Sequence, residues 1–391
     1  MRFNLSSTAL SSHLLSLSRV INSKNTLAIL NSFLFEVRNG QLAVTASDSE
    51  NVMQTALNLD NCEGEGRFAV NNQTIMNAVK ELPEQPLSIS VSMEEQKITI
   101  DYQNGSANFP IQNADEYPQT KPLADDATSL SVDAAILSDN ITRSLFATAN
   151  DEIRPVMNGI YFDLTQDALA VVASDGHKLV RNLNFNIKTE NPKAFIMPKK
   201  PATLLKNTIA RDSGNVVIRF DDKQAEVSYA DGKLTCRLIE GRYPNYNSVI
   251  PTDNPNEMTI DRRSLIGALR RVLPFASDSS ELVKFHMENG TLQIDAEDLD
   301  FATNATEHVT CEYGGMPMSI GFKGSSMLEI LNNLEGDNVI IKLADQSRGG
   351  IVVPEQQPEN QEVLMLIMPM LLNDEYRRGR LSCRLPAMKR T

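Results

Sequence analysis

Three segments of the chain share one pattern of apolar and polar residues. The clearest, Leu169–Leu179, has the sequence LAVVASDGHKL, and weaker copies of its first part lie at Leu42–Asp48 and Leu292–Asp298. The copies start 127 residues before and 123 residues after the central segment. An alternating apolar stretch that ends in small and acidic residues predicts a strand that runs into a turn. The near-equal spacing predicts that one structural repeat occurs three times.

The first repeat shows both helical and strand periodicity. A set of leucines and an isoleucine at helical spacing predicts an amphipathic helix of about four turns. These residues are Leu10, Leu14, Leu17 and Ile21. The expected elements, in chain order, are a strand at 2–5, this helix with its N-cap at Ser6 or Ser7, strands at 30–37 and 41–46, a helix at 72–82, and strands at 87–91, 97–102 and 106–111.

The other two repeats show the same order of elements. In the second, we expect helices at 133–149 and from about Pro201, and strands at 216–220 and 225–229. In the third, we expect helices at 261–273 and 325–334, and strands at 339–343, 350–353 and 363–368. The period-two strands predict antiparallel sheets with one buried face. We therefore predict an α+β fold of three repeats of about 125 residues, at 1–124, 125–252 and 253–372. The alternative is a coincidental similarity between ordinary domains.

Composition excludes several classes of protein. A chain of 391 residues with 41% apolar content can form two to four domains, and the repeat favours three. The net charge of −13 argues against a protein that grips nucleic acid tightly. Four cysteines and four histidines lie scattered, which suggests neither a disulfide framework nor a metal site, and we expect no cofactor. Without a signal peptide or a long apolar run, the chain is expected in the cytoplasm with no membrane contact.

Three motifs in this order produce a resemblance to a known family. They are Ser174–Leu179 (SDGHKL), Glu240–Tyr246 (EGRYPNY) and Ile367–Met370 (IMPM). On a threefold-repeated chain they resemble the bacterial DNA polymerase III beta subunits, the sliding clamps, over roughly residues 1–372. The resemblance implies a DNA clamp fold: a head-to-tail homodimer whose six repeats form a ring, with helices around the hole and sheets outside. It also implies a non-catalytic processivity factor that encircles duplex DNA nonspecifically and tethers the polymerase.

The acidic net charge is compatible with such a ring. A ring holds DNA by topology, so weak attraction suffices and permits sliding. Several basic residues fall on the predicted helices or their ends: Arg19, Lys24, Lys80, Arg143, Lys199, Lys200, Lys206, Arg262, Arg263, Arg270 and Arg271. The resemblance assigns DNA contacts to Lys24, Lys199 and Lys200, whereas the alternative is ordinary solvated helix faces. Asp151 and Glu281 stand where some relatives have Gln and Arg, so DNA contact at those loops is in question.

The central motif admits a chemical and an architectural interpretation. Ser174, Asp175 and His177 are the residue types of a nucleophilic triad, and a hydrolase that uses Ser174 and His177 is the alternative function. Three residues within four positions rarely achieve triad geometry, whereas Asp-Gly commonly forms a turn. Walker A, nucleophile-elbow and metal-ligand motifs are missing from the sequence. We therefore predict that the chain has no catalytic residues.

By resemblance, the motif belongs instead to a pocket between the second and third repeats that binds short peptides. The implied partners are the catalytic subunit of the replicative polymerase, the clamp loader and other proteins with a clamp-binding motif. Matching positions are Arg154, Met157, Ser174, Gly176, His177, Lys178, Leu179, Pro244, Val249, Leu366, Met368, Pro369 and Met370. Apolar walls with flexible methionines suit a linear motif, although plain core packing would also explain the methionines. Val156 and Ser248 depart from the Tyr and Arg of some relatives.

The two ends of the repeat array suggest how a ring closes. Three repeats in a row leave one unpaired sheet edge at each end, and exposed edges invite pairing with a second copy. Phe109 and Ile111 at one end, and Leu273 and Phe275 at the other, are the candidates for this joint; the alternative is packing within their own repeats. Residues 373–391 form a basic segment without apolar periodicity. We expect a mobile tail there, either an artificial addition or an extra contact with DNA or a partner.

Overall fold

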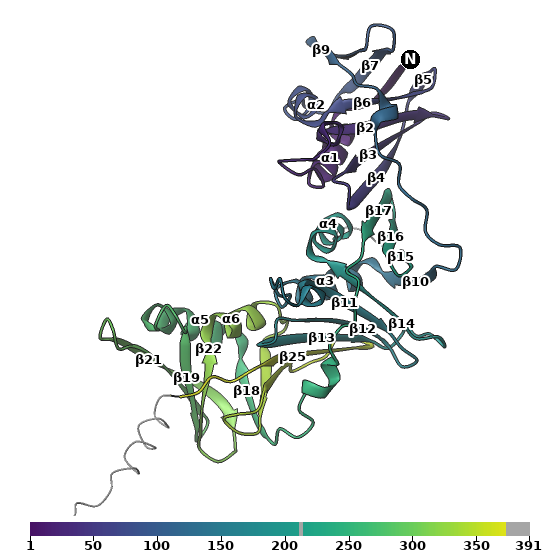
Figure 1. Cartoon of the computed structure of the whole chain (residues 1–391). Coiled ribbons are helices and arrows are strands. Elements are labelled where there is room, and N and C mark those ends of the chain that lie inside the picture. The colour runs from purple at the N-terminus through teal and green to yellow at the C-terminus, as the bar shows by residue number, and fades with distance from the viewer. Residues whose placement is uncertain (211–213, 373–391) are drawn as a thin grey trace, which may run out of the picture. The chain divides into compact units, whose positions relative to one another are not determined.

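The computed structural model describes residues 1–210 and 214–372 (Figure 1). The chain forms two compact units: Met1–Ile141 with Phe195–Glu240, and Thr142–Ala194 with the chain from Gly241 onward. Each unit therefore contains one terminal repeat and part of the central repeat. The predicted α+β class is confirmed, because helices and antiparallel sheets recur in one order along the chain. The predicted basic tail at 373–391 lies outside the described residues.

The helices of the first unit begin where the sequence predicts. They are α1 (Ser7–Ser18), α2 (Asn72–Val79) and α4 (Lys199–Ile209), while α3 (Ala134–Leu145) spans the boundary between the units. Ser6 is the N-cap of α1, and its hydroxyl accepts a hydrogen bond from the amide of Ala9 at 3.1 Å. The helix is shorter than the expected four turns, so Ile21 lies beyond its end.

The first unit has two antiparallel sheets. The smaller has the strand order β5 (Asn61–Glu63), β1 (Arg2–Ser6), β7 (Pro86–Ser92), β8 (Lys97–Tyr102) and β9 (Gly105–Pro110). The larger has the order β10 (Thr128–Asp133), β15 (Asn215–Phe220), β16 (Gln224–Tyr229), β17 (Gly232–Arg237), β4 (Asn51–Asn58), β3 (Gln41–Ser47), β2 (Ser32–Arg38) and β6 (Gly66–Asn71). Strands β4, β5, β6, β10 and β17 were not predicted from the sequence.

The larger sheet crosses from one repeat to the next. Strand β17 of the central repeat pairs with β4 of the first repeat, with Gly232 opposite Thr55 and Cys236 opposite Asn51. The backbones approach so closely at Gly232 that a Cβ atom there would lie 2.1 Å from the carbonyl oxygen of Gln54. Backbone hydrogen bonds therefore join the two repeats within this unit.

The second unit contains one long antiparallel sheet. From β11 its order is β11 (Gly159–Leu164), β12 (Leu169–Ser174), β13 (Lys178–Asn184), β25 (Gln361–Ile367), β24 (Gly350–Pro354), β23 (Asn338–Leu343), β18 (Asn256–Asp261), β21 (Thr303–Tyr313), β20 (Thr291–Asp298), β19 (Leu282–Glu288) and β22 (Met318–Lys323). Strand β14 (Lys193–Pro198) contains the unit boundary. The central and third repeats meet where β13 pairs with β25, with Leu179 opposite Leu366.

Two helices complete the core of the second unit. They are α5 (Arg262–Val272) and α6 (Gly324–Asn332). Asp261 is the N-cap of α5 and accepts from the amide of Ser264 at 2.7 Å. Residues such as Leu265, Leu269 and Phe285 are fully buried in the cluster that these helices cover. Among residues 1–210 and 214–372, no helix is both long and apolar enough to span a membrane.

Candidate functional site

The turn between β12 and β13 is fixed by its own side chains. The hydroxyl of Ser174 donates to the carbonyl oxygen of Lys178 at 2.9 Å and accepts from the amide of Gly176 at 3.1 Å. One carboxylate oxygen of Asp175 accepts from the amides of His177 and Lys178, each at 2.9 Å. Gly176 has a φ of 91°, a conformation that favours glycine. The turn interpretation therefore accounts for Ser174 and Asp175, because both bond to the backbone of the turn.

Lys178 supplies the positive charge of this turn. Its ammonium lies 2.9 Å from the carboxylate of Asp175 and 3.0 Å from that of Glu329 on α6. Burial alone would lower the pKa of Lys178, but hydrogen bonds and attraction from both carboxylates outweigh burial and raise it. Burial likewise opposes ionisation of Asp175, yet hydrogen bonds from Lys178 and from the backbone lower its pKa. Lys178 and Asp175 are therefore both charged at neutral pH, and Lys178 links the turn to α6.

A cavity of about 720 Å³ lies beside this turn, within the second unit. Eleven of the thirteen predicted pocket residues line it: Arg154, Met157, Ser174, Gly176, His177, Lys178, Leu179, Pro244, Val249, Leu366 and Met368. Pro369 and Met370, also predicted, lie beyond the lining. The amide of Met368 donates to the carbonyl oxygen of His177, whereas that of Met370 donates to Gly321 on β22, both at 2.8 Å. The chain therefore leaves the cavity after Met368 to pair with β22.

Tyrosines hold the wall that contains Pro244. The rings of Tyr161 and Tyr243 stack with centroids 4.5 Å apart, and the hydroxyl of Tyr246 donates to the carboxylate of Asp163 at 2.9 Å. Tyr243 and Tyr246 also line the cavity, so the Arg-Tyr-Pro-Asn-Tyr motif provides more of the wall than the sequence analysis assigned to it. The segment Ser347–Gly349, which also lines the cavity, was missed because it has no distinctive motif.

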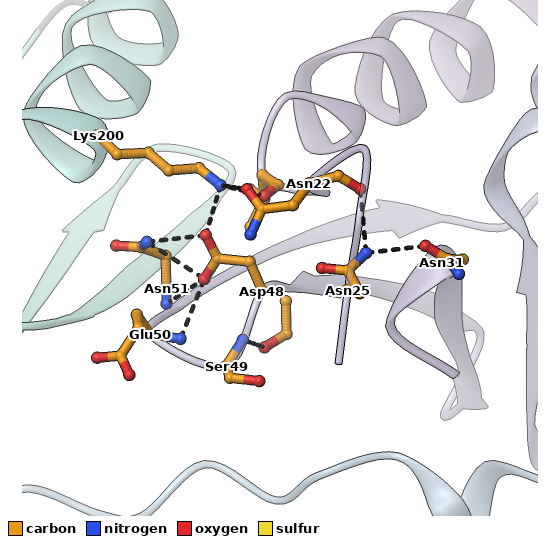
Figure 2. A network of polar contacts seen from close by, with 10 residues as sticks. Asn22, Asn25, Asn31, Asp48, Ser49, Glu50, Asn51 and Lys200 are labelled. Carbon is orange, nitrogen blue, oxygen red and sulfur yellow. Dashed lines mark hydrogen bonds and ion pairs between the residues drawn. The ribbon is translucent and has the colours of Figure 1, made fainter. Parts of the chain in front are cut away.

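The three lysines predicted to contact DNA differ in their surroundings. Lys24 is exposed in the loop after α1, and Lys199 is the first, half-buried residue of α4. The ammonium of Lys200 donates to the carbonyl oxygen of Val20 and to the side-chain oxygen of Asn22, both at 2.6 Å, and to the carboxylate of Asp48 (Figure 2). Lys200 therefore already has three acceptors within the chain.

Other basic candidates also have partners inside the protein. Arg143 is buried, 5% exposed, and lies 3.3 Å from the carboxylate of Glu335. Arg271 donates two hydrogen bonds to Glu307, at 2.8 and 2.9 Å. Arg262 donates to the backbone carbonyl oxygens of Leu331, near the end of α6, and of Gly336, just after that helix. These three arginines therefore make bonds within the fold, which the alternative of ordinary solvated helix faces did not anticipate.

The two acidic departures from the family pattern have structural roles. Asp151 accepts from the amides of Ile153 and Arg154 and from the guanidinium of Arg154 at 2.8 Å. Glu281 accepts from the hydroxyl of Ser325 at 2.6 Å and pairs with Lys323 at 3.2 Å. These partners lower the pKa of both carboxyl groups. As anions, Asp151 therefore stabilises its own loop, and Glu281 connects its loop to β22 and α6.

Comparison with known proteins identifies the family. Models of the DNA polymerase III beta subunit match three consecutive blocks: the N-terminal domain at residues 1–121, the central domain at 131–245 and the C-terminal domain at 247–371. The chain belongs to the DNA polymerase III beta subunit family. A beta sliding clamp from Pseudomonas aeruginosa is 26% identical over 375 residues, covering 95% of this chain and all of the relative. One from Synechococcus elongatus is 27% identical over 372 residues, covering 91% of this chain and 95% of the relative.

Solved structures of beta subunits share the fold. The crystal structure of a DnaN sliding clamp from Pseudomonas aeruginosa, bound to griselimycin, matches with a TM-score of 0.89 and 25% identity, covering 95% of this chain and all of that chain. The predicted resemblance is thus confirmed, and the chain is a sliding clamp, the non-catalytic processivity subunit of DNA polymerase III. The alternative hydrolase function is wrong.

The four residues predicted for the closing joint of the clamp differ in exposure. Phe109 on β9 and Leu273 after α5 are half-buried, and Phe275 is 41% exposed. Ile111 is only 5% exposed, and its amide donates to the carbonyl oxygen of Gln96 at 2.9 Å. Packing within its own repeat therefore describes Ile111 better than a role in the joint, whereas the other three retain surface for a second copy.

Proposed function

We propose that two copies of this chain close head to tail into a ring around duplex DNA, with domain boundaries at 1–124, 125–252 and 253–372. The observation that supports closure is the pairing between repeats. Strands β9, β17 and β25 hold the same place in their repeats, as do β4, β13 and β21. Within the chain, β17 pairs with β4 and β25 pairs with β13. The same rule leaves β9 to pair with β21 of a second copy.

The edges of β9 and β21 are compatible with this joint. Strand β9 ends the order of its sheet and pairs with β8 along one edge. Strand β21 pairs with β20 along Thr303–Thr310, but with β18 through Cys311–Tyr313. Most of its second edge therefore faces no strand within residues 1–210 and 214–372, and exposed edges favour pairing. Head-to-tail joints of this kind can close into a ring with rotational symmetry, and the ring proposed here has two chains and six repeats.

Closure can be tested with DNA topology. The clamp, loaded by its loader onto nicked circular DNA, should stay on the circle and slide off after linearisation. Phe109→Arg places a charge in the joint and removes burial worth roughly 1.5 to 3 kcal/mol at each of two joints. We expect this variant to sediment at micromolar concentration as a folded monomer of 43.3 kDa and to be lost from both DNA forms. An undiminished dimer with parental circular dichroism would place Phe109 outside the joint, and equal retention on both DNA forms would argue against encirclement.

We also propose that the 720 Å³ cavity binds a short peptide from partner proteins: the catalytic subunit of the replicative polymerase, the clamp loader and other clamp-binding proteins. Its walls combine apolar residues, such as Leu179, Pro244 and Met368, with polar groups of the Asp175–Lys178 turn. Apolar walls with a few fixed polar groups suit linear motifs. By family membership we assign this function to the cytoplasm.

The peptide site can be tested separately from the ring. Met368→Glu introduces a charge into the apolar wall, and we expect the affinity for a polymerase-derived peptide, measured by fluorescence anisotropy, to fall at least about thirtyfold, or 2 kcal/mol. Met93→Glu is the matched control, because Met93 is similarly exposed, 49% against 38%, but lies in the first unit. Dimer mass should be unchanged in both variants. Unchanged peptide affinity in Met368→Glu would show that the peptide binds elsewhere.

A further inference from the structure

Lys200, in the first turn of α4, directs its ammonium group at residues of the first repeat. Its ammonium group has three protons, and three acceptors of the first repeat receive them: Val20, Asn22 and Asp48 (Figure 2). The side chain of Asp48 is 3% exposed and that of Lys200 is 35% exposed. We call this group of four residues the Lys200 clasp. A DNA phosphate could approach the ammonium only by displacing one of these acceptors.

The carboxylate of Asp48, which accepts from Lys200, is also held by groups of its own turn. One oxygen of Asp48 accepts from the amides of Glu50 and Asn51, at 3.0 and 2.7 Å, and the side-chain amide of Asn51 donates to both oxygens. Burial opposes ionisation, but hydrogen bonds from Lys200 and Asn51 lower the pKa of Asp48. The Lys200–Asp48 ion pair of the clasp is therefore positioned by the turn that contains Asp48.

The other two acceptors belong to the loop that contains Lys24. Val20 lies next to Arg19, the C-cap of α1, at the end of the helix where the helix dipole favours a cation. Asn22 lies two residues before Lys24, and the side-chain amide of Asn25, one residue after it, donates to the backbone oxygen of Asn22 at 3.1 Å and to the side chain of Asn31 at 2.8 Å. Lys24 therefore lies between two residues that this network holds in place, while its own side chain stays exposed.

We infer that Lys200 is a positioning residue, which fastens the loop at 20–31 so that Lys24 can meet DNA phosphates, and that Lys200 makes no phosphate contact itself. The inference rests on the proposed encirclement of DNA and on the assignment of Lys24 as a DNA contact. It replaces the sequence-based assignment of Lys200 to the DNA-binding set. The side chain of Lys24 is exposed to solvent, whereas the ammonium group of Lys200 is bonded to residues of the first repeat.

Salt dependence of DNA binding separates the two lysines. Each phosphate contact contributes about 0.9 to the slope of log affinity against log salt concentration, so Lys24→Met should reduce the slope by about 0.9 per chain. Lys200→Met should lower affinity for a short DNA duplex about three- to tenfold with the slope unchanged. In the double variant the loss should be no greater than in Lys24→Met alone, because Lys200 acts through Lys24. A slope reduced by Lys200→Met, or additive losses, would overturn the inference.

Hydrogen exchange tests the fastening without DNA. The backbone amides of residues 20–31 should exchange about tenfold faster in Lys200→Met, while Lys24→Met leaves them unchanged. Asp48→Asn should reproduce the faster exchange. Unchanged exchange in Lys200→Met would overturn the fastening. An unchanged salt slope in Lys24→Met would instead refute the proposed DNA contact, and with it the DNA role of the clasp, whatever the exchange result.

Discussion

The turns that follow β3 and β12 occupy the same place in the first and central repeats, yet they have different roles. In each, the aspartate accepts from two backbone amides of its own turn. In each, the next residue has a positive φ: 81° for Ser49 and 91° for Gly176. The turns differ in the source of the cation. Asp48 pairs with Lys200 of another repeat, whereas Asp175 pairs with Lys178 of its own turn.

The source of the cation determines what each turn can do. Because Lys200 lies on α4 of the central repeat, its ion pair with Asp48 connects the first repeat to the central repeat. Because Asp175 pairs with Lys178 of its own turn, Gly176 and His177 remain available to line the cavity. The third turn keeps the same capping, since Asp298 accepts from the amides of Asp300 and Phe301 at 2.8 and 3.2 Å. One local motif therefore serves several purposes, and the residues around it select among them.

Removing the charge of each aspartate should separate the two turns most strongly. Asp48→Asn leaves the half-buried Lys200 without its anion, and we expect the free energy of unfolding to fall by about 2 kcal/mol. Asp175→Asn should cost less than about 1 kcal/mol, because an amide oxygen can still accept from the turn and Lys178 keeps Glu329. Denaturant midpoints at one fixed chain concentration provide the measurement. Equal losses would mean that the source of the cation does not matter.

Substitution of the residue that follows the aspartate in each turn should change the free energy of unfolding by a smaller amount. Gly176→Ser forces a side chain into the left-handed region and should cost about 1 kcal/mol. A Cβ at Gly176 would lie 3.5 Å from the guanidinium of Arg154, so backbone strain and not a clash is the cause. Ser49→Gly relieves the same strain but increases the conformational entropy of the unfolded chain. The free energy of unfolding should therefore rise by only about a few tenths of a kcal/mol. Thermal unfolding of both variants tests this, and a stabilised Gly176→Ser would refute it.

Acid should lower the contribution of both aspartates to the free energy of unfolding, and this loss should be absent near neutral pH. The pKa values of Asp48 and Asp175 are lowered by folding. Their contribution to stability is therefore complete above the unfolded pKa of about 3.9 and is lost as the pH falls through the lower folded values. Unfolding midpoints measured between pH 3 and 6 should decline below about pH 4, and less steeply in Asp48→Asn. An identical decline in that variant would exclude Asp48 as a contributor.

The sequence predicted the repeat and most elements because periodicity and caps are local signals. The Ser6 cap, the α2 start at Asn72 and the strand Lys97–Tyr102 are examples. Eleven pocket positions were correctly gathered at one cavity by resemblance, although peptide binding stays a prediction. The acceptors of Lys200 could not be predicted, because they lie 152 to 180 residues earlier and no periodicity records which acceptor a long side chain reaches. The alternation that nominated Ile111 does not distinguish a buried face from a joint, and its side chain is only 5% exposed in the single chain.

The junction between β17 and β4 also has an evolutionary consequence. Its register pairs are held by backbone groups, which every residue type except proline provides, so side chains along it can diverge with little effect on the connection. A beta subunit of Pseudomonas aeruginosa, with only a quarter of its residues identical, keeps the same fold accordingly. Gly232 is the exception, because a Cβ there would collide with the backbone of Gln54. Sequence drift is therefore tolerated at the exposed positions of the junction, whereas the buried Met53, Leu234 and Cys236 must keep filling the core and Gly232 admits no side chain.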